Sequence, residues 1–392
     1  MIETPTADAL EPQPSTLGQG KWRLDDWLLL LCVGVLLGIG IVVLFSSTYI
    51  MDSSDVFSIL RRQMLWMLAS TLAFLFAMRI NLDAVREVIW YAVPVAIVLC
   101  LMVFLPVIGR EINGTRRWLI LGPMRLQVAE VLKVVLIFLM AHYLSAYQRR
   151  LGTVTWGFLI PGAIIGISFG LVLLQPDYGT AFLCALVCGI LLFLAGGRLK
   201  FWVPAGLLGL GGFSLLVWNN PERLSRVTSF LALGDEAVRK DDGYQLWQGI
   251  LGFASGGNTG VGLGHGRQQL TYLPEAHTDF IFSIVGEEMG FVMTGLILLL
   301  FLGIFIIVNF KLKFAPTVYQ YLVVQGCLLF MLLQALINMG VVTGVLPTKG
   351  MSLPFISYGG SNLILMFFCL GVILNASRSW RGRDVKGGTA TA

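Results

Sequence analysis

GGNTGVGLGHGRQQLTYLPEAHTDFIFSIVGEEMG, residues 256–290, joins a glycine-rich polar loop to the start of a long apolar run. The loop brings Glu275, His277 and Asp279 to the point where the apolar run begins. Only 12% of the residues are charged and 56% are hydrophobic, so several polar groups at the mouth of an apolar segment indicate a functional site. We interpret Asp279 as the reactive carboxylate and the other segments as the walls of a cavity around it.

The rest of the chain has the composition of a polytopic membrane protein with an all-α fold. A helix that crosses a bilayer core of about 30 Å needs roughly 20 apolar residues. The formal net charge is only +5 and the basic residues are dispersed, so we expect no nucleic-acid partner. About ten apolar runs of suitable length lie near residues 27–48, 63–80, 87–108, 127–147, 156–175, 179–196, 201–218, 280–309, 317–341 and 359–377.

Charge predicts the topology of these spans. An excess of Lys and Arg in one set of short loops is typical of the cytoplasmic side, and an even number of spans places both termini there. We expect a disordered cytoplasmic tail over 1–24, a membrane domain over 25–378 with a long extracytoplasmic loop at 219–279 between helices 7 and 8, and a cytoplasmic tail over 379–392. The basic groups that define the inner side are Lys21 and Arg23, Arg79 and Arg86, Arg149 and Arg150, Arg198 and Lys200, Lys311 and Lys313, and Arg378, Arg381, Arg383 and Lys386.

Some cations break this pattern on the outer side. Arg116, Arg117 and Arg125 fall in the short outer loop after the third span, and Lys349 lies in the last outer loop. One interpretation is that their long side chains extend from apolar surface to water at the interface. The other is that they contact an anionic ligand on the outer face.

Charges within the spans are candidates for function, because a charge in the bilayer centre costs about 3 kcal/mol or more. Glu130 and Lys133 are three residues apart and share a helix face, so they form either a structural ion pair or part of a substrate site. Asp177 lies in QPDYGT between two spans, where it can cap the next helix or line a cavity with the non-helical backbone.

Asp279 also has a structural interpretation, since Asp with Thr278 is a favourable helix N-cap. A carboxylate held ionised at a helix start beside water remains available as a base near neutral pH. Glu287 and Glu288 lie two turns further on, and the sequence does not decide which of them faces the cavity.

Four segments resemble the signature segments of the SEDS family of membrane proteins, which includes FtsW, RodA and SpoVE. The similarity covers nearly the whole chain, and PTKG at 347–350 is closer to the FtsW branch than to the RodA branch. The last motif ends in Ser361-Asn362, where the family has two small residues. The segments are NGTRRWLILGPMRLQVAE (113–130), QPDYGT (175–180), LPEAHTDFIFSIVGEEMG (273–290) and PTKGMSLPFISYGGSN (347–362).

The resemblance implies a peptidoglycan glycosyltransferase that polymerises lipid II, a polyprenyl-pyrophosphate-linked disaccharide peptide, at the division septum. It implies an inner-membrane location with the active site facing the periplasm. The expected protein partners are a class B penicillin-binding transpeptidase and other divisome proteins. It implies that Asp279 is catalytic and that Glu130, Lys133 and Asp177 belong to the central cavity. Trp118 and Lys349 match family motif positions, and Trp118 either stacks on a sugar or anchors the chain at the interface.

This chemistry agrees with the residues present. Pyrophosphate is already a good leaving group, so one carboxylate that deprotonates the acceptor hydroxyl suffices, with cations for the departing charge. We expect Arg116, Arg117, Arg125 and Lys349 to contact the pyrophosphate. The sequence contains no dedicated metal cluster, so a divalent cation such as Mg²⁺ or Mn²⁺ would be held partly by substrate. Two alternatives remain open at this point, a lipid II flippase and a non-catalytic divisome scaffold.

Overall fold

The computed structural model describes residues 22–51, 56–105, 109–112, 115–121, 124–241, 243–268 and 277–387. Nearly all of the predicted N-terminal tail and Glu275 lie outside these residues. Each of the ten predicted spans coincides with a helix. These helices are α1 (Leu24–Met51), α2 (Val56–Ala77), α3 (Leu82–Met102), α4 (Val128–Ala146), α5 (Ile160–Leu173), α6 (Tyr178–Leu194), α7 (Leu199–Trp218), α12 (Ile281–Leu312), α13 (Val318–Val342) and α14 (Gly360–Gly387).

Among the described residues, eight helical segments are long and apolar enough to cross a membrane: α1, α3, α4, α5 with the π-helical turn Thr155–Leu159 before it, α7, α12, α13 and α14. Helix α6 is apolar but has 17 residues, and α2 packs along α14. In an 18-residue apolar stretch of each helix, 83% of the residues are buried in α14 and 72% in both α4 and α13, but 0% in α7. Helices α4, α13 and α14 therefore form the centre of the bundle. Helix α7 lies at its edge, where its apolar side chains suit contact with lipid.

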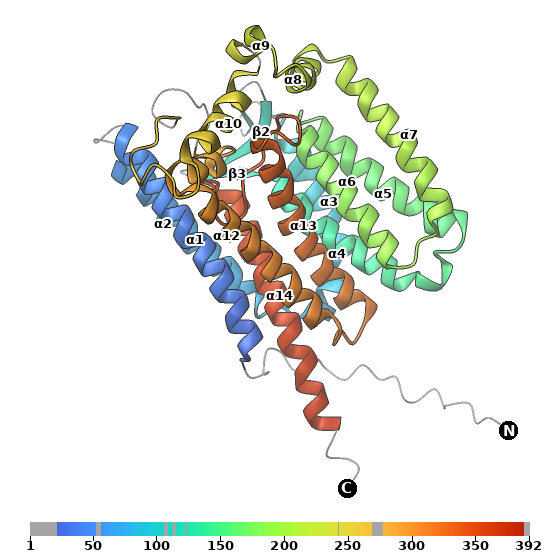
Figure 1. Cartoon of the computed structure of the whole chain (residues 1–392). Helices are drawn as coiled ribbons and strands as arrows, with labels where there is room; N and C mark the ends of the chain where they lie inside the picture. The colour runs from blue at the N-terminus through green and yellow to red at the C-terminus, as the bar shows by residue number, and fades with distance from the viewer. Residues whose placement is uncertain are drawn as a thin grey trace, which may run out of the picture.

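The two ends of the bundle differ (Figure 1). The start of α1 and the end of α14 lie at the same end, as an even number of crossings requires. Helix α14 continues to Gly387, past the predicted end of the membrane domain at 378. A short 3₁₀ helix, Gln148–Arg150, follows α4. The opposite end carries a small sheet and the helices that follow α7.

The small sheet is a feature that the all-α prediction missed. Strands β1 (Gly109–Ile112), β2 (Thr115–Leu121) and β3 (Met124–Gln127) form an antiparallel sheet in the order β1-β2-β3. Trp118 pairs with Gln127 across β2 and β3, and a bulge lies between residues 110 and 111 in β1. The dipeptides Asn113-Gly114 and Gly122-Pro123 separate the strands. Both are turn signals that could have predicted this sheet.

The predicted outer loop at 219–279 also contains helices: α8 (Pro221–Leu231), α9 (Glu236–Lys240) and α10 (Tyr244–Gly256). Helix α10 packs against α12, where Ser283 Oγ donates a 2.7 Å hydrogen bond to Gly249 O. Gly290 interrupts α12 with φ 75°, and a Cβ there would lie 2.4 Å from Gly260 N. Glycine is therefore required both for the kink and for the close approach of the loop that follows α10.

Candidate active site

A cavity of about 990 Å³ opens among β2, β3, the helices α4, α6, α8, α13 and α14, and the segment before α12. It brings together eight of the nine predicted site residues, from four separate parts of the sequence. They are Trp118, Arg117, Arg125, Glu130, Lys133, Asp177, Asp279 and Lys349. The exception is Arg116, which is exposed on β2. Its neighbours Thr115, Arg117 and Trp118 all line the cavity.

Asp279 lies in a turn whose main-chain oxygens accept hydrogen bonds from two other segments. Asn338 Nδ2 on α13 donates to Asp279 O at 2.7 Å and to Met351 O at 2.6 Å. The backbone of Tyr358 donates to His277 O at 3.0 Å. Asp279 is not the N-cap residue that was predicted, because the N-cap of α12 is Phe280, whose side chain makes no cap bond. The main chain at Asp279 is held by tertiary contacts.

Gly350 lets the Asp279 carboxylate approach the α13–α14 connection closely. A Cβ at position 350 would lie 2.6 Å from Asp279 Oδ2, which is well inside van der Waals contact. Any larger residue would displace the carboxylate. The sequence predicted importance for this loop only through Lys349.

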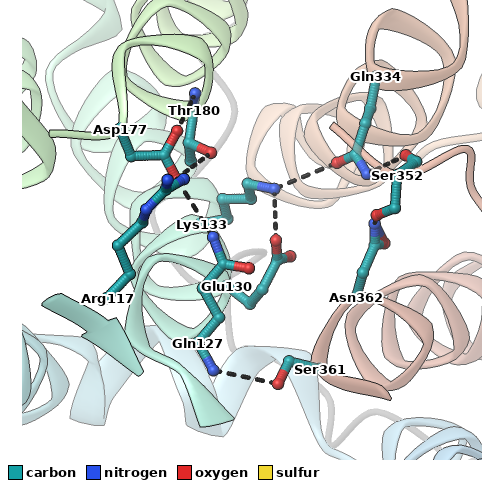
Figure 2. Close-up of polar contacts among 10 residues, drawn as sticks. All are labelled: Arg117, Gln127, Glu130, Lys133, Asp177, Thr180, Gln334, Ser352, Ser361 and Asn362. Carbon is teal, nitrogen blue, oxygen red and sulfur yellow. Dashed lines mark hydrogen bonds and ion pairs between the residues drawn. The ribbon is translucent and has the colours of Figure 1, made fainter. Parts of the chain in front are cut away.

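Asp177 has both of its predicted roles. It is the N-cap of α6, where Oδ1 accepts from Thr180 N at 3.1 Å and Oδ2 accepts from Thr180 Oγ1 at 3.0 Å. It also faces the cavity, where Arg117 Nη1 lies 3.6 Å from Oδ2 and Gln127 Nε2 donates to Oδ2 at 3.2 Å. Figure 2 shows these groups converging on one carboxylate.

Glu130 and Lys133 form the predicted ion pair, with 2.9 Å between Lys133 Nζ and Glu130 Oε1. Lys133 also donates to Gln334 Oε1 at 3.1 Å, and Gln334 Nε2 donates to Ser352 O at 2.9 Å (Figure 2). This chain links α4, α13 and the α13–α14 connection across the cavity. Sequence reasoning missed Gln334, Ser352 and Asn338, because neutral polar side chains in apolar helices carry no charge signal.

Helix α14 is bonded to the edge of the sheet. Ser361 Oγ donates to Arg125 O at 2.9 Å and accepts from Gln127 N at 3.1 Å. These bonds fix β3, which carries Arg125, against the first turn of α14. Ser361 of this chain therefore has a structural role at the end of the last loop.

Lys349 lies between the cavity and α7. Its Nζ is 4.9 Å from the ring centroid of Phe182 and 5.6 Å from that of Phe213, both within cation–π range. Burial lowers the pKa of Lys349 from its usual value, with Asp177 opposing the shift and Arg223 adding to it. An anion that entered the cavity would stabilise the charged form of this lysine.

Cations predominate on the accessible part of the cavity. We call Arg117, Arg125, Arg223, Arg226 and Lys349 the cationic rim, because all five line the cavity and are half-buried or exposed. Arg223 also donates to Pro176 O at 3.2 Å and lies over the ring of Tyr178. Arg223 and Arg226 come from α8, in the long loop between α7 and α12. The rim can bind a phosphate-bearing group through charge-assisted hydrogen bonds.

Glu287 and Glu288 do not line this cavity. Glu287 Oε1 accepts from Arg267 N at 2.8 Å, and Glu288 Oε1 accepts from Gly264 N at 2.9 Å and from Ser46 Oγ at 2.8 Å. Both carboxylates therefore hold the glycine-rich loop against α12. The expectation that one of them faces the cavity is wrong, because the kink at Gly290 brings the loop over that part of the helix.

The described residues of the site form no dedicated cluster of metal ligands. Within the described ranges, no three His, Cys, Asp or Glu side chains lie close enough to hold one. The cavity is lined by the carboxylates Glu130, Asp177, Glu222 and Asp279 as well as by cations. Mg²⁺ is usually bound through one or two carboxylates together with substrate phosphates and water, so a divalent cation here would be held partly by the substrate.

Comparison with known proteins agrees with this geometry. A family model described as "Cell cycle protein", FtsW/RodA/SpoVE, matches residues 26–382. The chain is 40% identical to the probable peptidoglycan glycosyltransferase FtsW of Coxiella burnetii over 90% of this chain and 96% of that protein. It is 35% identical to the stage V sporulation protein E of Bacillus subtilis, over 91% and 98%.

A solved structure has the same fold. One chain of a peptidoglycan synthase complex that coordinates polymerization and crosslinking superposes with a TM-score of 0.73 at 26% identity, over 92% of this chain and 99% of that one. The resemblance seen in the sequence motifs is therefore confirmed over nearly the full length. The chain belongs to the FtsW/RodA/SpoVE family of integral membrane cell cycle proteins.

Proposed function

We propose that this protein is a peptidoglycan glycosyltransferase that polymerises lipid II, with Asp279 as the general base. The observation that carries the proposal is the convergence of Asp279 and the cationic rim on one cavity of about 990 Å³. A base and an anion-binding surface in one cavity match a reaction between a sugar hydroxyl and a sugar pyrophosphate. The family relatives named as peptidoglycan glycosyltransferases support the same reaction class.

In the proposed reaction, Asp279 takes the proton of a hydroxyl group on the acceptor sugar. The hydroxyl oxygen then forms a bond to the anomeric carbon of the donor, and the bond from that carbon to the pyrophosphate oxygen breaks. The pyrophosphate leaves with the electron pair and its developing charge is stabilised by the cationic rim. A positioned base contributes about 10²–10⁴-fold, and alignment of the two lipid-linked sugars supplies a further large factor.

The proposed contacts to the leaving group are Arg117, Arg125 and Lys349, joined by Arg223 and Arg226 of α8. Arg116 is the weakest of the predicted contacts, since it lies outside the cavity. Trp118 lines the cavity from β2 and is placed to stack on a sugar ring. A divalent cation that bridges the pyrophosphate would be held largely by the substrate, because no three His, Cys, Asp or Glu side chains of the described residues lie together.

We further propose that the cavity opens toward the periplasm at the division septum, with both termini cytoplasmic, and that lipid tails enter between the helices. The basic pairs of the sequence support this orientation. The proposed partner is a class B penicillin-binding transpeptidase, together with other divisome proteins. A relative solved in a complex for polymerization and crosslinking supports it, because crosslinking requires a second activity beside polymerisation.

The test is polymerisation of purified lipid II by the purified full chain, with and without the partner, followed by gel analysis of the products. We expect a ladder of glycan strands without added ATP, since the donor already carries its leaving group. The absence of strands when the partner is present, from protein that still binds lipid II, would contradict the proposal.

A further inference from the structure

Two hydrogen-bond acceptors deep in the cavity have no partner within the described part of the chain. We call Glu130, Lys133, Gln334 and Asn362 the cavity floor, because these cavity-lining side chains of α4, α13 and α14 are each more than nine-tenths buried. Glu130 Oε1 accepts from Lys133, but Glu130 Oε2 has no partner among the described residues. Asn362 Nδ2 donates to Ser352 Oγ, and Asn362 Oδ1 likewise has none there.

Such atoms need an explanation, because buried polar atoms in folded proteins almost always have a hydrogen-bond partner. Asn338 and Gln325 on α13 also have buried side-chain oxygens without a partner among the described residues, but neither side chain lines the cavity. Glu130 and Asn362 differ because a ligand in the cavity can reach them. Both atoms can therefore accept hydrogen bonds from a ligand in the cavity.

The chemistry of the two atoms restricts what that ligand group is. A carboxylate oxygen and an amide oxygen only accept, so they pair with O–H or N–H groups. Pyrophosphate oxygens also only accept and are negative, so Glu130 repels them. Sugar hydroxyls and the N–H of an acetamido group are donors without charge. The cavity floor therefore suits one part of the substrate, and the cationic rim suits another.

We propose that Glu130 and Asn362 form a subsite that accepts hydrogen bonds from the hydroxyl and amide N–H groups of the substrate's sugar. The proposal rests on the proposed function and adds the orientation of the head group, with the sugar toward the floor and the pyrophosphate at the cationic rim. In this arrangement Lys133 holds Glu130 through Oε1, so that Oε2 stays directed to the ligand. Gln334 in turn holds Lys133 against Ser352 O.

The test compares the affinity of one protein for three ligands with the same polyprenyl chain. They are lipid II, the bare polyprenyl pyrophosphate, and the lipid-linked disaccharide without its peptide. Binding is measured on the full chain at a fixed detergent concentration. The variant Asn362→Leu removes the acceptor at similar volume, and Asn362→Ala serves if leucine prevents folding. Gln325→Leu is the matched control, because it removes a buried amide oxygen away from the cavity.

We expect Asn362→Leu to weaken binding of lipid II by roughly 3–10-fold, the usual worth of one hydrogen bond. Binding of the bare pyrophosphate should stay within about twofold, because the cationic rim is intact. The loss should persist with the disaccharide that lacks the peptide. Gln325→Leu should leave all three affinities at the wild-type level.

Three results would overturn the subsite. The first is an unchanged affinity for lipid II in Asn362→Leu. The second is an equal loss for lipid II and for the bare pyrophosphate, which indicates a structural role for Asn362. The third is a loss that disappears without the peptide, which assigns the donors to the peptide rather than the sugar. None of them bears on Asp279, whose substitution tests the polymerisation reaction separately.

Discussion

At the scale of single residues, two groups that carry no charge help to position Asp279. Asn338 holds its main chain and Gly350 leaves space for its side chain. A reactive group placed in this way is sensitive to small changes in its neighbours, since a misplacement of about 1 Å can cost about 10²-fold in rate.

Gly350→Ala is predicted to lower the polymerisation rate by roughly 10–100-fold. The new Cβ would lie 2.6 Å from Asp279 Oδ2, so the carboxylate must move away from it. The measurement is the initial rate of strand synthesis together with the melting temperature, which should change little. Gly38→Ala in α1 is the control, since a Cβ there meets nothing within 4 Å. A wild-type rate in Gly350→Ala would mean that the carboxylate does not act from this position.

Lys349 should give the enzyme a sensitivity to alkaline pH. Burial lowers the pKa of Lys349, so this side chain loses its proton and its charge at a lower pH than an ordinary lysine. The polymerisation rate should therefore fall as pH rises, at a lower pH than an ordinary lysine would lose its proton. Lys349→Arg should move this fall to higher pH, because a guanidinium stays protonated where this lysine does not. Identical alkaline profiles for the two proteins would remove Lys349 from the anion contacts.

At the scale of elements, the positions of the ten long helices were predictable from apolar runs alone. The Glu130–Lys133 pair and the cap at Asp177 also followed from local spacing, because partners at i+3 are fixed by helix geometry. The link from Lys133 to Gln334 joins residues 201 positions apart, and no local pattern reports such a contact. The sheet was missed because its strands are short and lie between two strong helix signals.

The contacts of the glycine-rich loop were also not predictable from the sequence. The sequence placed Glu287 and Glu288 near the site by number, but their partners are backbone N–H groups of the loop. Every residue except proline has a backbone N–H group, so the sequence does not show which of them will donate to a side chain. The kink at Gly290 decides which way these carboxylates face, and a glycine inside a long apolar run does not by itself predict a kink.

Glu287→Gln is predicted to loosen this loop. The carboxylate accepts from the backbone N–H groups of Arg267 and Gln268, and an amide has one acceptor fewer and places a donor against them. We expect a loss of about 1–3 kcal/mol in loop docking, read as faster tryptic cleavage after Arg267 in detergent. The control is Glu236→Gln, whose exposed pair with Lys240 contributes little. Equal cleavage rates in all three proteins would show that Glu287 does not hold the loop.

At the scale of the whole molecule, the proposed orientation in the membrane rests on the charge pattern and on the shared end of α1 and α14. Single cysteines in a background without the six native cysteines can test it. A cysteine at Glu236 in α9 should react with an impermeant maleimide in intact spheroplasts. A cysteine at Arg149, after α4, should react only after lysis. The reverse pattern would place the cavity on the cytoplasmic side and contradict the proposed reaction with periplasmic acceptors.

The central claim is that Asp279 removes the proton from the acceptor sugar. The most direct measurement is strand synthesis from purified lipid II by Asp279→Asn, beside wild type and Asp235→Asn, which keeps a good N-cap residue on α9. The account predicts that Asp279→Asn folds and binds lipid II but makes no glycan strands, whereas Asp235→Asn makes them at the wild-type rate. Strand synthesis by Asp279→Asn at the wild-type rate would contradict it.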